Sequence, residues 1–198
     1  MRRWKLLVAL VLVAGATTIA TPPGGTPVAA TVLADEANDP TTRPYGAITF
    51  LGDSVGLGSV YYSPSITDQL AAHGWGPIRA RAGVGYNALP PSGSNETRVI
   101  HWIQRWRNQG WDAPNVIINL GANDSANCNS VAACRTIILR VVDAIGPGHR
   151  VWWPMITHLT PGQADRWNTA LAQLAQERDD FFTWDWPTVM ATGGYSSP

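Results

Sequence analysis

The sequence predicts an α/β protein, in which a parallel sheet is covered by helices on both faces. Two observations carry this prediction. Short apolar runs of strand length alternate along the chain with amphipathic segments of helix length, which is the pattern of βαβ units. The chain has 198 residues, of which 45% are hydrophobic, so it is long enough to bury one core. We expect about five strands in a flavodoxin-like, doubly wound sheet with three α/β/α layers.

The predicted strands are short runs rich in apolar residues. In chain order they cover residues 47–51, 77–82, 116–120, 150–156 and 181–184. Pro154 lies inside the fourth run, and it predicts that this strand ends early or bends.

The predicted helices begin at cap residues, and most of them end at glycine. They cover residues 63–73, 95–110, 130–146 and a last segment that begins at Thr160-Pro161. Because strands and helices alternate, we expect helical crossovers between parallel strands.

The first 34 residues have the order of a secretory signal peptide. Arg2, Arg3 and Lys5 precede an apolar run, which a Pro/Gly stretch and small residues follow. The run is shorter than the ~20 residues of a membrane-spanning helix, so we expect no stable membrane span. Cleavage is expected after Ala30 or Ala34, and an uncleaved signal anchor is the alternative. We therefore expect a secreted protein.

After the signal peptide, we expect a polar tether over residues 35–44 and one globular domain over residues 45–198. The 14 Lys and Arg residues balance 14 Asp and Glu residues, so no basic surface for nucleic acid is expected. The two cysteines are too few for a Cys-rich zinc site, and we expect neither a metal nor an organic cofactor. In an exported protein, Cys128 and Cys134 are expected to form a disulfide, although two free thiols remain the alternative.

Glycine-rich segments follow the first three predicted strands, with the sequences GDSVG at 52–56, GVG at 83–85 and GAND at 121–124. In a doubly wound sheet the ligand site lies beyond the carboxyl ends of the strands, so Ser54 and Asn123 are expected to meet there. A serine hydroxyl, exposed backbone N–H groups and an asparagine amide supply a nucleophile and an oxyanion hole for acyl transfer. Taken alone, the serine could be a helix cap and the asparagine part of a turn.

Two other motif matches are weaker. Residues 52–56 also fit the G-x-S-x-G elbow of α/β-hydrolases, but that fold places several strands before the elbow. Residues 83–88 fit a dinucleotide-binding G-x-G-x-x-A, but the acidic residue expected near position 105 is missing.

The three glycine-rich blocks, in this order and each after the matching strand, resemble those of the SGNH (GDSL-like) hydrolase family. The resemblance covers nearly the whole chain after the tether, and it implies a flavodoxin-like fold and ester hydrolysis or acyl transfer. It assigns Ser54 as nucleophile and places the oxyanion donors at the Ser54 N–H, a glycine N–H of the second block and the Asn123 side chain. Gly83 fits the second donor because it directly follows its strand, with Gly85 as the alternative. In this interpretation Asp53 shapes the turn and is not the triad acid.

The family's last block, Asp-x-x-His, supplies the general base, and this sequence does not contain it. We expect the chain to continue past Pro198 into that block. Within the sequence, His158 follows the fourth predicted strand and is the substitute base, with Asp185 as the residue that could orient it. Trp184 could line an acyl or sugar pocket together with Trp186, although core packing is the default for both.

The predicted function is that of a secreted serine esterase or acyltransferase. Its expected substrate is a small-molecule, lipid or acylated carbohydrate ester. The alternative is a non-catalytic ligand-binding protein on the same fold, which keeps the pocket and lacks the base. The sequence carries no signal for the oligomeric state.

Overall fold

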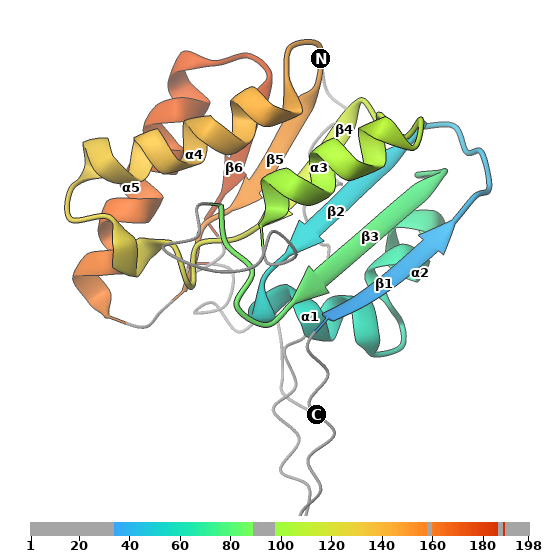
Figure 1. Ribbon diagram of the computed structural model, residues 1–198, viewed down its shortest axis with the longest axis horizontal. Coiled ribbons are helices and arrows are strands. Elements are labelled where there is room, and N and C mark those ends of the chain that lie inside the picture. Colours follow the sequence, from blue (N-terminus) through green and yellow to red (C-terminus); the bar gives the residue numbers. More distant parts are fainter. Residues whose placement is uncertain (1–33, 89–97, 158–159, 186–187, 189–198) are drawn as a thin grey trace, which may run out of the picture.

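A computed structural model describes residues 34–88, 98–157, 160–185 and 188. Its centre is a six-stranded sheet with the order β1-β3-β2-β4-β5-β6 (Figure 1). The strands are β1 (Ala34–Asp39), β2 (Ile48–Gly52), β3 (Ile78–Gly83), β4 (Asn115–Asn119), β5 (Arg150–Pro154) and β6 (Phe181–Trp184). The last five are mutually parallel, and β1 runs antiparallel to β3 at the edge. Without β1, the strand order is that of flavodoxin, as the sequence predicts.

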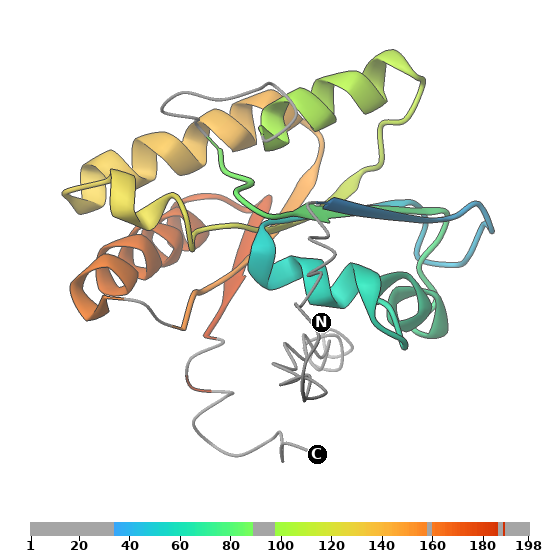
Figure 2. The same cartoon turned by 60° about the horizontal axis from the view of Figure 1, so that its bottom comes forward.

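Helices cover both faces of the sheet. They are α1 (Ser54–Tyr61), α2 (Ile66–Ala72), α3 (Val99–Asn108), α4 (Val131–Ile145) and α5 (Pro161–Glu177), with a short 3-10 helix η2 (Ser125–Asn127). Figure 2 shows α3 and α4 on one side of the sheet and α1 and α2 on the other. Residues of α5 pack in the same core cluster as α3 and α4. None of the helices in the described part of the chain is long and apolar enough to cross a membrane.

The core consists of two clusters, one on each face of the sheet. Because successive strand residues point to opposite faces, Leu51 and Trp153 pack with α3, α4 and α5, whereas Phe50 and Ile117 pack with α1 and α2. All five residues of β2 and of β4 are buried. These two central strands are therefore held rigidly, and the loops that follow them start from fixed points.

The expected tether differs from the structure over its first half. Residues 34–39 form β1, which pairs with β3 over its whole length, from Ala34 opposite Gly83 to Asp39 opposite Ile78. The segment is polar, so it has no apolar run that would predict a strand, but an edge strand tolerates charged side chains. Residues 40–44 do connect β1 to the rest of the domain. Apart from Ala34, the expected signal peptide lies outside the described residues.

The helix expected over residues 63–73 is present as the shorter α2, although the segment after β2 forms two helices, of which the sequence predicts only the second. The first, α1, begins at Ser54. The sequence does not predict this helix because it contains Gly56 and Gly58, and glycine disfavours helix formation. The second, α2, begins after Ser65, whose hydroxyl and the Asp68 carboxylate form a capping box. The expected α4, α5 and β6 are confirmed, and β5 ends at Pro154.

Candidate active site

Ser54 and Asn123 follow the two central strands at the carboxyl edge of the sheet. Strands β2 and β4 are adjacent and parallel, with Gly52 opposite Asn119, and the Asp53 N–H donates to the Asn119 carbonyl at 3.0 Å. This is the point where the strand order reverses, at which open α/β sheets bind ligands. Ser54 is exposed there as the first residue of α1.

Asp53 joins the two turns that carry these residues. Its side chain is 1% exposed, one carboxylate oxygen accepts from the Val55 N–H at 2.9 Å, and the other accepts from the Ala122 N–H at 3.3 Å. Burial raises the pKa of Asp53 to about 6, against the lowering effect of these backbone hydrogen bonds. The carboxylate thus links the Ser54 turn to the Asn123 turn, and both its oxygens serve this link.

Asn123 and its neighbour Asp124 fasten the third glycine-rich block to the second. The Asn123 Nδ2 donates to the Tyr86 carbonyl at 2.8 Å, and the buried Asp124 carboxylate accepts from the Ala88 N–H at 3.0 Å. An amide nitrogen carries two hydrogens, and among the described residues only one of those of Asn123 has a partner, so the other can serve a ligand.

The two glycines of the second block have different surroundings. Gly83 is buried at the end of β3, and a Cβ atom there would lie 2.3 Å from the Tyr86 ring, so this glycine allows the ring to pack. Gly85 is exposed, with φ +73°, and a Cβ atom there would have no neighbour within 4 Å. As a whole residue Gly85 is thus the more accessible of the two, and both glycines stay candidates for the second oxyanion donor.

The Cys128–Cys134 disulfide is present. It connects the residue after η2 to α4, both cysteines are buried, and the Cys128 carbonyl accepts from the Arg166 Nε of α5 at 3.3 Å. Within the same segment, Asn127 Nδ2 donates to the Asn123 carbonyl at 3.0 Å. The bridge therefore braces the loop that follows the Asn123 amide.

The candidate base, His158, lies outside the described residues, as does Trp186. The exposed Asp185 bonds to the hydroxyl and the N–H of Thr188, which holds the pKa of the Asp185 carboxyl below its usual value. His149 directly precedes β5, at the opposite edge of the sheet.

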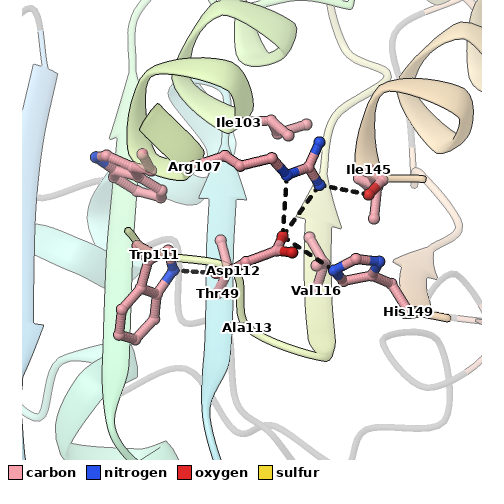
Figure 3. Close-up of a pocket in the computed structure, with 10 residues that line it drawn as sticks. Thr49, Ile103, Arg107, Trp111, Asp112, Ala113, Val116, Ile145 and His149 are labelled. Atoms are coloured by element: carbon pink, nitrogen blue, oxygen red, sulfur yellow. Dashed lines mark hydrogen bonds and ion pairs between the residues drawn. The ribbon is translucent and has the colours of Figure 1, made fainter. Parts of the chain in front are cut away.

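At this opposite edge, Arg107, Asp112 and His149 form a cluster that the sequence does not reveal (Figure 3). Arg107 donates to the Asp112 carboxylate at 3.0 Å and to the carbonyls of Ala144 and Ile145 at the end of α4, while His149 Nε2 lies 3.1 Å from the same carboxylate. The cavity beside them has a volume of about 20 Å³, space for roughly one water molecule. This cluster joins α3, α4 and β5 and is too closely filled to hold a substrate.

Several solved structures have a fold similar to that of this chain. No protein-family model and no curated protein matches the chain. The C-terminal catalytic domain of peptidoglycan O-acetyltransferase A from Streptococcus pneumoniae is similar, with a TM-score of 0.55 and 16% identity over 75% of this chain and 73% of that one. A member of the lipolytic protein G-D-S-L family from Veillonella parvula is similar with a TM-score of 0.55 and 15% identity, over 75% and 82% of the two chains. The chain therefore has the fold of the SGNH (GDSL-like) hydrolases, which its three sequence blocks predict.

Proposed function

We propose that this chain is a serine esterase or acyltransferase that acts on a carboxylic ester. The observation that carries the proposal is the arrangement at the carboxyl edge of the sheet. An exposed serine at the start of a helix and an asparagine amide follow adjacent strands, and a buried carboxylate links their turns. One hydrogen of that amide has no partner among the described residues.

In the proposed reaction, the Ser54 hydroxyl oxygen attacks the ester carbonyl carbon and gives its proton to a base, for which His158 is our candidate. The carbonyl oxygen becomes an oxyanion that accepts hydrogen bonds from the Ser54 N–H, the N–H of Gly83 or Gly85, and the Asn123 amide. Loss of the alcohol leaves an acyl-enzyme, and water or a second alcohol then takes the acyl group. Both outcomes are supported by the similar structures, which include an O-acetyltransferase and a lipolytic protein.

We also propose that the protein is secreted. The disulfide supports this, because disulfides persist in oxidising compartments. Of the two predicted cleavage positions, the one after Ala30 leaves β1 whole, whereas cleavage after Ala34 removes the residue that pairs with Gly83. The substrate class stays as predicted, a small-molecule, lipid or acylated carbohydrate ester.

Substitution of the nucleophile tests the proposal. We expect Ser54→Ala to lower the hydrolysis of an aryl acetate by about 10³-fold or more, because no other group then forms the acyl-enzyme. The matched control is Ser59→Ala in the same helix, where the lost hydroxyl is buried and has no hydrogen-bond partner among the described residues. This control should keep its activity.

A covalent probe separates catalysis from binding. The similar acetyltransferase structure carries a methylsulfonyl adduct, so methanesulfonyl fluoride is the reagent of choice. The wild-type and Ser59→Ala chains should gain one methylsulfonyl group by mass spectrometry, and Ser54→Ala none. Full activity of Ser54→Ala would refute the proposal. Binding of an ester without turnover or labelling would instead identify a non-catalytic binding protein.

A further inference from the structure

The orientation of the Asn123 amide depends on Tyr86. A carbonyl oxygen only accepts hydrogen bonds, so the 2.8 Å contact with the Tyr86 carbonyl fixes the nitrogen of the amide, not its oxygen, on that side. If Tyr86 moves, the remaining amide hydrogen is directed elsewhere. The position of Tyr86 therefore decides whether Asn123 can donate to an oxyanion.

Tyr86 is itself held at both ends. Its side chain is 3% exposed, and the ring occupies the space that a side chain at Gly83 would fill. Its hydroxyl accepts from the Arg81 Nε at 2.7 Å, and its backbone N–H donates to the Gly83 carbonyl at 3.3 Å. The tyrosine thus joins β3 to the loop that follows it.

Arg81 connects this tyrosine to the edge strand. Glu36 of β1 lies directly opposite Arg81 in the antiparallel pair, and its carboxylate accepts from the Arg81 Nη1 at 3.0 Å. The guanidinium carbon also lies 3.7 Å from the centre of the Trp102 ring of α3. A planar guanidinium held by a carboxylate, a hydroxyl and an aromatic face has little freedom to rotate.

We propose that Glu36, Arg81 and Tyr86 form a positioning relay that orients the Asn123 amide, so that the edge strand β1 supports the oxyanion hole. The relay is the sequence of contacts Glu36–Arg81–Tyr86–Asn123, and each of its members other than Asn123 is a positioning residue. Its effect on turnover rests on the proposed function, whereas its effect on the Asn123 amide does not.

The test uses single substitutions in the full chain. Tyr86→Phe removes the hydroxyl and keeps the ring and the carbonyl, Arg81→Lys keeps the charge and loses the Nε donor, and Glu36→Ala releases the guanidinium from β1. The control is Glu177→Ala, which breaks an ion pair of the same kind between α4 and α5, away from the relay. Unfolding midpoints identify any variant that is destabilised.

One measurement is independent of catalysis. The side-chain amide signals of Asn123 in a ¹⁵N-edited spectrum, assigned through Asn123→Ala, should shift in all three relay variants. They should stay in place in Glu177→Ala. The Arg81–Tyr86 hydrogen bond is already lost in Arg81→Lys, so adding Tyr86→Phe to that variant should shift the signals no further than Arg81→Lys alone does.

The second measurement is the kinetics of aryl acetate hydrolysis. A misdirected oxyanion donor weakens binding of the transition state and not of the substrate, so we expect kcat to fall about 10-fold in Tyr86→Phe with little change in KM. Unmoved Asn123 signals in Tyr86→Phe would overturn the relay, whether or not the chain turns over an ester. Moved signals together with an inactive wild-type chain would uphold the relay and refute the proposed function.

Discussion

At the scale of single residues, Asp53 combines a cost in stability with a function in the site. The carboxylate is almost fully buried, and its two oxygens accept hydrogen bonds from backbone N–H groups of two different turns. An asparagine in its place accepts with one atom only, and its NH₂ group would face the second N–H. The aspartate therefore suits the geometry of the site, although its burial disfavours the charged form.

This predicts an unusual dependence of stability on pH. The pKa of Asp53 is raised from 3.8 to about 6, so the folded state holds the proton more tightly than the unfolded state. Stability should fall as the pH rises from about 4 to 6 and level off above, with a contribution of about 3 kcal/mol from this residue. In Asp53→Asn the decrease in stability that this residue causes between about pH 4 and pH 6 should disappear. Urea unfolding of both chains at several pH values measures it, and an identical slope would contradict the prediction.

At the scale of elements, the loop between β4 and α4 is braced by the disulfide. Cys128 and Cys134 are separated by six positions, so the closed loop is short and the bridge stabilises the fold by only about 2 kcal/mol. The bridge lies next to η2, whose Asn127 contacts the Asn123 carbonyl. This position indicates that the bridge mainly fixes the conformation of the loop that follows Asn123, which forms one wall of the site.

We therefore expect the bridge to matter more for activity than for folding. The double substitution of Cys128 and Cys134 by alanine removes the bridge without burying a new polar group. The variant should keep its circular dichroism spectrum and a cooperative unfolding transition, while hydrolysis of an aryl acetate falls about 10-fold because the wall is looser. A folded variant with unchanged activity would show that the bridge has no part in the site.

At the scale of the whole molecule, the carboxyl and amino edges of the sheet carry different groups of polar residues. The carboxyl edge carries Ser54 and Asn123, whereas the amino edge carries the Arg107–Asp112–His149 cluster, which joins α3, α4 and β5 (Figure 3). Partial burial tends to raise the pKa of Asp112, but the hydrogen bond from Arg107 and the charges of His149 and Arg107 outweigh it and hold that pKa below its usual value.

The separation of the two edges predicts that Asp112→Asn destabilises the protein without changing the activity of Ser54. A lowered pKa means that the ionised carboxylate stabilises the fold above its unfolded pKa, and that this gain is lost as the pH falls through the folded pKa. The loss in Asp112→Asn should be no more than about 1 kcal/mol at pH 7, because the side chain is 52% exposed, and should vanish in acid. Denaturant unfolding at pH 7 and pH 3 tests this, with Glu177→Gln, equally exposed, as the comparison. A change in kcat would contradict the separation of the two edges.

Local signals in the sequence determine the α/β class, most of the helices and strands, and the place of Ser54 and Asn123. Apolar runs and helix caps act over a few residues, and the carboxyl ends of adjacent parallel strands must meet at one edge. Only the tertiary structure decides that residues 34–39 form a strand. This polar segment shows no strand pattern in the sequence, and it becomes a strand because the edge of β3 supplies its hydrogen-bond partners. The same holds for the separate surroundings of Gly83 and Gly85, which depend on where the Tyr86 ring packs. The Glu36–Arg81 and Tyr86–Asn123 contacts join residues far apart in the chain, and polar side chains show no periodicity that reveals such partners.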